Sequence, residues 1–296
     1  QQIEDFSQFE PVTKFSAHVE TVTRLPDLLR QAFREATSGV PAPVHLQVQN
    51  RGGQIIEQEA DLDLIVEQQY TCSPAWRPEP DMQCVSKALA VVAKAQRPVI
   101  VAGSGVVWSR AQREVVELAE KLQIPVITSL KAKATIVDSH PLSVGVSGSY
   151  SRDCANSTLR EADLVFFIGS KAGGHVTHFW HFPSAGTPVI QLDISPSELG
   201  RNYPNTASIL GDAKVSLRRM IDAAQPKSPE AAKAWLGRVH EIVAMWSAEN
   251  EPNRNSDVAP IRPERICKEI SEILPPDGVV VSDTGHAGIW TGTMID

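Results

Sequence analysis

The stretch of sequence that decides the fold is Arg97-Pro98-Val99-Ile100-Val101-Ala102-Gly103-Ser104-Gly105, a short apolar run that ends in two closely spaced glycines. An apolar run of this length, bounded by proline and glycine, predicts a buried β-strand. Residues 110–122 follow with apolar side chains at helical spacing, among them Val115 and Leu118, and predict an amphipathic helix. A second strand is expected over residues 124–128. The local pattern is therefore strand, helix, strand.

This alternation continues to about residue 224. Three further apolar runs predict strands over residues 163–169, 188–193 and 207–212, and helices are expected near residues 152–161 and at 213–223. Continuous apolar strands that alternate with amphipathic helices are typical of a parallel sheet with helices on both faces. The predicted fold class is α/β: a doubly wound, Rossmann-like central domain, flanked by partial pieces of two further α/β domains.

The domain boundaries follow from shifts in composition. Residues 1–50 contain an extended segment, a helix and a strand, too little to bury a core alone, and are interpreted as the last part of a domain. Residues 51–82 form a linker, and the central domain covers residues 83–225. Residues 226–260 form a second linker that contains a helix. Residues 261–296 begin another domain, with a helix that reaches residue 274.

The last domain is predicted to start with a phosphate-binding turn. The apolar run Gly278-Val279-Val280-Val281 predicts a strand, and Asp283-Thr284-Gly285 follows it. A strand that leads into a glycine-containing turn lets backbone N–H groups approach an anion closely. We expect no helix or further strand after this turn, so the chain should end where such a site begins.

Composition excludes several classes of function. The chain has 296 residues, with 42% hydrophobic and 21% charged residues, as in soluble globular proteins. A net charge of −7 argues against nucleic-acid and anionic-membrane partners. Apolar runs stay well below the ~20 residues that a membrane-spanning helix needs. The cysteines form neither a C-x-x-C pair nor a metal-type cluster, which predicts reduced thiols in a cytoplasmic protein. They are Cys72, Cys84, Cys154 and Cys267.

Two predicted strand ends in the central domain carry candidate nucleotide contacts, at Gly103 with Gly105 and at Asp193. Gly103 and Gly105 begin a strand-to-helix turn, but Trp108 stands where a dinucleotide fingerprint has its third glycine. The turn therefore either offers backbone donors to an anion or is a tight turn without a ligand, which is the favoured interpretation. Asp193 ends a strand and either accepts from a ribose hydroxyl or caps a helix that starts at Pro196.

The loop after residue 169 holds another candidate, Lys171, and a group of histidines. Glycines after Lys171 permit either close approach to a ligand or a plain loop, and the plain loop is favoured. His175, His178 and His181 recur at intervals of three, as on one helical face, but no cysteine or H-E-x-x-H pattern accompanies them. We expect no metal there. Trp108 and Trp180 are interpreted as packing anchors rather than as stacking platforms for a base.

The order of these pieces resembles thiamine-diphosphate-dependent enzymes of the acetolactate synthase and pyruvate oxidase type. The resemblance rests on five weak motifs in the right order and covers nearly the whole chain. They are residues 9–14 with 40–46, residues 97–105, residues 162–169, residues 189–196 with 209–213, and residues 283–286. It identifies the chain as an internal portion of such an enzyme, centred on the central domain.

The resemblance implies an enzyme that uses thiamine diphosphate and Mg²⁺ to decarboxylate a 2-oxo acid and pass the acyl group to an acceptor. Gly285, His286 and Ala287 would lie along the diphosphate. Some central domains of the family hold FAD or ADP, and Gly103, Gly105, Lys171 and Asp193 are the candidate contacts. The FAD-binding members usually carry arginine where Lys171 stands, which lowers the expectation of FAD.

The resemblance also implies what this chain leaves out. The family's glutamate that activates the cofactor would precede Gln1, and its Gly-Asp-Gly metal motif would follow Asp296. No catalytic or metal-binding residue is therefore assigned, and the fragment alone is expected to be inactive. Family members assemble as homodimers or tetramers. The alternatives are a nucleotide-binding module, a structural domain for subunit contacts, and one part of a split enzyme.

Overall fold

The computed structural model describes residues 6–48, 59–275 and 277–296. Residues 51–58 of the predicted first linker lie outside these ranges. Contacts within the chain divide it into two compact units, residues 1–77 and residues 78–296, and each is described by itself. The finer domain boundaries given above remain predictions.

The first unit is built around a parallel βαβ motif. Strand β1 (Phe15–Val19) pairs with β2 (Val44–Val48), with Phe15 opposite Val44. Helix α2 (Leu25–Thr37) connects them and buries Leu28 and Ala32. Parallel neighbours need such a crossover connection. The short elements of this unit are α1 (Phe6–Phe9), η1 (Glu10–Val12), η2 (Val22–Arg24) and η3 (Gln68–Tyr70).

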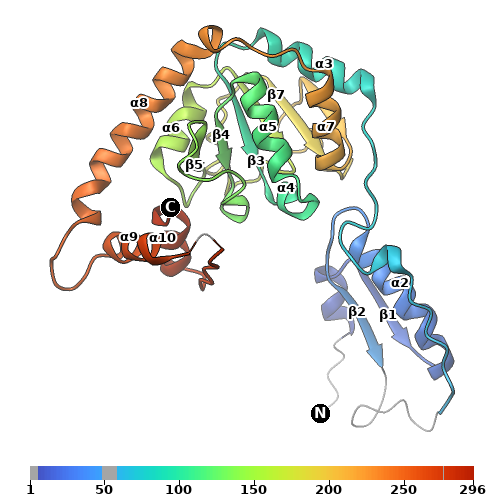
Figure 1. Cartoon of the computed structure of the whole chain (residues 1–296). Helices are drawn as coiled ribbons and strands as arrows, with labels where there is room; N and C mark the ends of the chain where they lie inside the picture. The colour runs from blue at the N-terminus through green and yellow to red at the C-terminus, as the bar shows by residue number, and fades with distance from the viewer. Residues whose placement is uncertain (1–5, 49–58, 276) are drawn as a thin grey trace. The chain divides into compact units, whose positions relative to one another are not determined.

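The second unit contains a six-stranded, entirely parallel sheet (Figure 1). The strands lie in the order β5-β4-β3-β6-β7-β8. Their bounds are β3 Pro98–Ala102, β4 Val126–Thr128, β5 Ser143–Val146, β6 Leu164–Ile168, β7 Val189–Asp193 and β8 Ala207–Leu210. Renumbered by their sequence order, the strands run 3-2-1-4-5-6, the doubly wound arrangement. The predicted fold class is confirmed.

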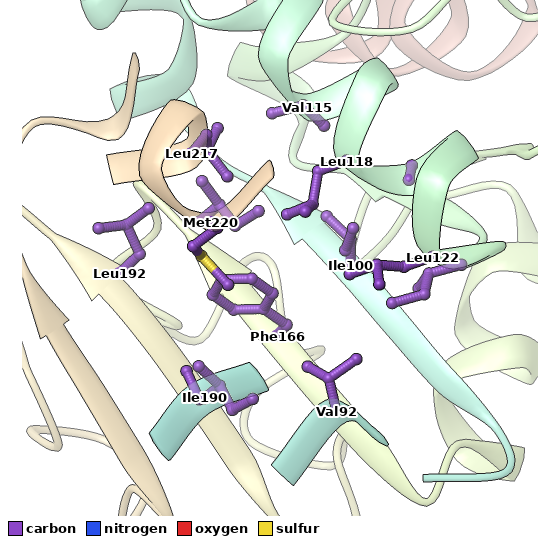
Figure 2. Packing of buried hydrophobic residues seen from close by; sticks show 14 of the residues in the cluster. Val92, Ile100, Val115, Leu118, Leu122, Phe166, Ile190, Leu192, Leu217 and Met220 are labelled. Carbon is purple, nitrogen blue, oxygen red and sulfur yellow. The ribbon is translucent and has the colours of Figure 1, made fainter. Parts of the chain in front are cut away.

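One face of this sheet is covered by α3 (Met82–Lys94), α5 (Gln112–Leu122) and α7 (Ala213–Ala223). Figure 2 shows side chains of these helices pointing toward Ile100, Phe166 and Ile190 of the strands. All three strand residues are 2% exposed or less. Their burial is the main contribution to the stability of this layer, at roughly 25 cal/mol per Å² of apolar surface removed from water.

The opposite face is covered by α6 (Asp153–Glu161) and α8 (Pro229–Arg254). The alternate strand residues, such as Val99 and Phe167, point to this side because successive residues of a strand face opposite ways. Trp235 of α8 is buried here, and its indole Nε1 donates to the carbonyl oxygen of Pro98 at 3.0 Å. The sheet is therefore a middle layer with a separate apolar core on each side.

The short elements that were not predicted include strand β5 and helix α4 (Ser104–Ser109). Strand β5 contains a serine and a glycine among four residues, so its apolar run is too short to stand out. Helix α4 lies within what looked like a turn, because valines and a tryptophan are weak helix formers. The helix predicted to start at Pro196 is also wrong, because residues 196–200 form turns.

The carboxyl-terminal part differs most from prediction. Helix α9 (Pro263–Ile273) forms as expected, but residues 278–283 form no strand. Val279 and Val281 are 82% and 92% exposed. A strand needs neighbouring strands to pair its backbone groups and bury its side chains, and no strand pairs with these residues in the described part of the chain. Helix α10 (His286–Met294) then follows Gly285, where we expected no helix. Figure 1 shows α9 and α10 side by side.

Candidate functional site

The main candidate site is a cavity at the carboxyl ends of the central strands. The order of the strands reverses between β3 and β6, and open α/β sheets bind ligands at this point. A cavity of about 450 Å³ opens there. Its walls come from the segments that follow β3, β4, β5 and β6. Polar side chains in the lining are those of Ser104, Ser129, Lys131, Ser147, Tyr150, Ser170, Lys171 and His175.

The predicted glycines of the first turn are needed for packing. A Cβ atom on Gly103 would lie 2.3 Å from the carbonyl oxygen of Gly169, and one on Gly105 would lie 2.7 Å from the Cα atom of Gly169. Their amides are also engaged: Gly103 N donates to Ile168 O at 2.8 Å, and Gly105 N donates to Gly169 O at 2.9 Å. The geometry therefore matches the tight turn that the sequence favoured. Gly103 still lines the cavity.

Lys171 lies in the cavity wall with an exposed side chain. Its Nζ atom is 3.2 Å from a carboxylate oxygen of Glu198, and its carbonyl oxygen accepts from the Asn202 side chain at 2.7 Å. The Lys171 side chain is 63% exposed, but that of Glu198 is only 7% exposed, so this ion pair is only half exposed. Arg201, which lies 3.1 Å from the same Glu198 oxygen, would remain as a partner of that carboxylate if the Lys171 ammonium group turned to an anion in the cavity.

Asp193 does not line this cavity. It is buried at the end of β7, and its Oδ1 atom accepts from the backbone N–H of Ser195 at 2.9 Å. Burial is the main cause that raises the pKa of this carboxyl above its ordinary value, and the nearby Glu198 carboxylate adds to the effect. In this arrangement Asp193 closes a local turn. That role is closer to the capping alternative than to a contact with ribose.

The histidine segment forms an irregular turn, and its spacing does not place the rings on one helical face. Residues 178–180 all have positive φ, from 49° to 62°. Such φ values are uncommon for residues other than glycine and cluster at functional sites. Within the described ranges, no group of three His, Cys, Asp or Glu side chains is arranged to hold a metal ion.

The cavity lining includes one aromatic ring, Tyr150, that the sequence analysis did not single out. Tyr150 stacks on His175 with ring centroids 5.9 Å apart, and His175 lies 6.1 Å from Phe179. Trp108 and Trp180 are 54% and 56% exposed, so the interpretation of these two as packing anchors is wrong. Tyr150 was missed because β5, the strand that leads to it, was missed; only Gly148 nearby marked a turn.

The predicted diphosphate contacts lie at the start of α10, outside the cavity lining. Gly285 precedes the helix with φ 73° and has no atom within 4 Å of a built Cβ. His286 and Ala287 are exposed in the first helical turn. The first N–H groups of a helix lack partners within it, and the positive end of the helix dipole attracts anions. The first turn of α10 therefore fits a phosphate group, although Asp283 brings one negative charge close to it.

In the described parts of the chain, no helix is both long enough and apolar enough to cross a membrane. The structure thus brings Gly103 and Lys171 together at one cavity, which Gly105 borders through its contact with Gly169. Asp193 and the start of α10 are separate from it.

A family model described as "Thiamine pyrophosphate enzyme, central domain" matches residues 85–220. The chain is 30% identical over 299 residues to a probable acetolactate synthase large subunit of Methanocaldococcus jannaschii, a match that covers 98% of this chain and 49% of the relative. It is 27% identical to the putative thiamine pyrophosphate-containing protein YdaP of Bacillus subtilis (98% and 48% covered). It is 29% identical to glyoxylate carboligase of Escherichia coli O157:H7 (97% and 47% covered). The chain spans about half the length of these relatives.

Proposed function

Since this chain belongs to the thiamine pyrophosphate enzyme family, whose central domain it contains in residues 85–220, we propose that it is part of a thiamine-diphosphate- and Mg²⁺-dependent enzyme that acts on a 2-oxo acid. The proposed reaction is decarboxylation followed by transfer of the acyl group to an acceptor, as in acetolactate synthase. The observation that carries the proposal is the match to relatives named as such enzymes over almost the entire chain.

The part of this chain that would face the cofactor is the start of α10. Backbone N–H groups of His286 and Ala287 would donate to the diphosphate, and Gly285 would let it approach without a side chain in the way. When bound, thiamine diphosphate supplies the stabilised carbanion that this chemistry requires. The role left to these residues is to hold and orient the anionic end of the cofactor.

We propose that the metal ligands lie outside residues 1–296, because the Gly-Asp-Gly run that the family resemblance implies does not occur in this sequence. Mg²⁺ prefers oxygen ligands around phosphate. For the same reason we propose that residues 1–296 alone neither bind the cofactor tightly nor turn over substrate. Cytoplasmic location and assembly into a homodimer or tetramer are further parts of the proposal.

The cavity between β3 and β6 favours a second candidate function, the binding of a nucleotide such as ADP. Its position, the exposed ammonium of Lys171 and the stacked Tyr150–His175 pair are suited to a phosphate and a planar base. The engaged amides of Gly103 and Gly105 count against it, and so does the internal hydrogen bond of Asp193. An absorbance spectrum separates the outcomes: a flavin band, released adenine, or neither, as for a structural domain.

Calorimetry tests the main proposal. Thiamine diphosphate is titrated in the presence of Mg²⁺ into the natural gene product and, separately, into residues 1–296. We expect saturable binding to the gene product and none to residues 1–296. Failure of the gene product to bind contradicts the proposed function, whereas saturable binding to residues 1–296 contradicts the proposed division of the site. Copurifying polypeptides would indicate a split enzyme instead.

A further inference from the structure

A single buried arginine joins the central domain to the far end of α10. Arg152 precedes α6, and its side chain is 7% exposed. Its guanidinium donates to both carboxylate oxygens of Asp138, at 3.1 and 3.2 Å. It also lies over the ring of Trp246, with 5.0 Å between its Cζ atom and the ring centroid. Asp138 is also paired with Lys133, whose Nζ atom lies 2.9 Å from Oδ2. The charge of Arg152 is thus fixed in place within the central domain.

Nε and Nη2 of Arg152 also reach the carboxyl end of α10, and Nη2 shares its two N–H groups between Asp138 and this end. Nε donates to the carbonyl oxygen of Thr293 at 2.7 Å, and Nη2 donates to the carbonyl oxygen of Ile295 at 3.1 Å. Nη2 also donates to Oδ1 of Asp296 at 3.0 Å. The last carbonyls of a helix lack partners within it, and a cation next to them is stabilising. Arg152 therefore acts as a C-terminal cap supplied from a distant part of the chain.

The surroundings leave little room for Arg152 to move. Gly145 of β5 has φ 106°, and a Cβ atom there would lie 2.6 Å from Cδ of Arg152. Met294 and Ile295 are buried against Trp246 and Cys267 on the same side. The carboxyl end of α10 is consequently held by both an apolar cluster and a polar one.

The opposite end of α10 has no comparable support in the described residues. The buried residues of the helix are Gly292, Thr293 and Met294, all in its last turn, whereas residues 281–287 are exposed. Nine helical residues span about 13 Å, so a tilt of about 10° at the fixed end moves the other end by about 2 Å. A shift of that size would stretch a hydrogen bond from the first amides of α10 to a bound phosphate beyond its usual length of about 3 Å and so weaken cofactor binding.

We propose that Arg152 is a positioning residue for the cofactor: by fixing the carboxyl end of α10 to the central domain, it sets where Gly285, His286 and Ala287 lie. This inference rests on the proposed function for its consequence, but not for its structural part. Arg152 itself touches neither the start of α10 nor any reacting atom. It acts through the helix.

The test compares Arg152→Gln with a matched control, Arg160→Gln, in the natural gene product. Arg160 lies on α6 but is exposed and contacts Phe182 rather than α10. Hydrogen exchange should accelerate about tenfold or more at backbone amides of residues 289–294 in Arg152→Gln, with no change in β3. The dissociation constant for thiamine diphosphate should rise about tenfold or more, while kcat at saturating cofactor stays within about twofold. Arg160→Gln should change neither.

Arg152→Lys and Asp138→Asn keep the test decisive if Arg152→Gln does not fold. A lysine carries its three donors on one nitrogen and cannot span acceptors that Arg152 reaches from three separate nitrogens, so Arg152→Lys should show the same pattern in weaker form. Asp138→Asn leaves the carbonyl acceptors of α10 in place and should also act more weakly. Unchanged exchange in α10 for all folded variants overturns the structural part. Faster exchange with unchanged cofactor affinity overturns the positioning role. A gene product that never binds thiamine diphosphate overturns the proposed function while the exchange result stands.

Discussion

Replacing Gly103 by alanine tests the close packing between the ends of β3 and β6. The backbone of Gly103 has φ −102° and ψ 178°, which any residue adopts, so the effect of a methyl group is steric alone. That methyl group would lie 2.3 Å from Gly169 O, and 2.6 and 2.7 Å from Cβ and Cα of Ser170. These are mostly backbone atoms, which cannot rotate away. The two strand ends must therefore separate.

The expected cost follows from three contributions. Overpacking at a tight site costs about 1–3 kcal/mol. Stretching the hydrogen bond from Gly103 N to Ile168 O costs about 0.5–1.5 kcal/mol more. Replacing glycine reduces the entropy of the unfolded chain and returns about 0.4–1 kcal/mol. We expect a net loss of about 1–4 kcal/mol in the free energy of unfolding.

Gly173→Ala is the matched control, because Gly173 lines the same cavity but has nothing within 4 Å of a built Cβ. It should leave stability unchanged or raise it by up to about 1 kcal/mol. Urea unfolding followed by circular dichroism measures both variants. With a slope of about 3 kcal/mol per M, the Gly103→Ala midpoint should fall by about 0.3–1.3 M. Equal midpoints for Gly103→Ala and the unaltered chain would refute the packing described here.

Three further predictions concern the core, a thiol and a carboxyl group. Leu118→Ala should lower the free energy of unfolding by about 3–5 kcal/mol because Leu118 is fully buried. Leu210→Ala is the control: its side chain is 46% exposed, and the substitution should cost about 1 kcal/mol or less. Urea unfolding measures the free energy of unfolding of both variants. Burial raises the pKa of Cys154 to about 12, so iodoacetamide at pH 8 should label the exposed Cys72 and leave Cys154 unlabelled until the protein is unfolded, as mass spectrometry would show. Burial also raises the pKa of Asp193 above its ordinary value of 3.8. The contribution of this carboxyl to the free energy of unfolding is therefore full below pH 3.8 and is lost as the pH rises through the pKa of the folded state. Asp193→Asn should flatten the resulting fall in the urea midpoint, and a pH profile that the substitution leaves unchanged would contradict this prediction.

The central sheet could be predicted because its signal is local. Five of its six strands are apolar runs bounded by turns, and α7 begins and ends where its pattern places it, at Ala213 and Ala223. The Asp212 side chain caps that helix by accepting from Val215 N at 3.2 Å, a cap that a sequence can display. Strand β5 lacked such a signal because its sequence has little intrinsic preference for a strand, and its pairing with β4 decides its conformation.

The candidate site was less predictable because it depends on contacts between distant segments. Gly103 and Lys171 were found as residues that follow strands, and that position is readable from the sequence. The pairing of Lys171 with Glu198, the stacking of Tyr150 on His175 and the contacts of Arg152 at the end of α10 join residues up to 144 positions apart. The valines at 279–281 show the opposite error: a strong local β pattern forms no strand where the structure supplies no neighbouring strand.

The proposed decarboxylation is tested most directly by measuring CO₂ release from carboxyl-labelled pyruvate and other 2-oxo acids. The natural gene product is assayed with and without thiamine diphosphate and Mg²⁺. We expect release that requires both additions and that stops when the cofactor is withdrawn. Release that is independent of thiamine diphosphate, or none from any 2-oxo acid by a protein that has bound the cofactor, would contradict the proposed function.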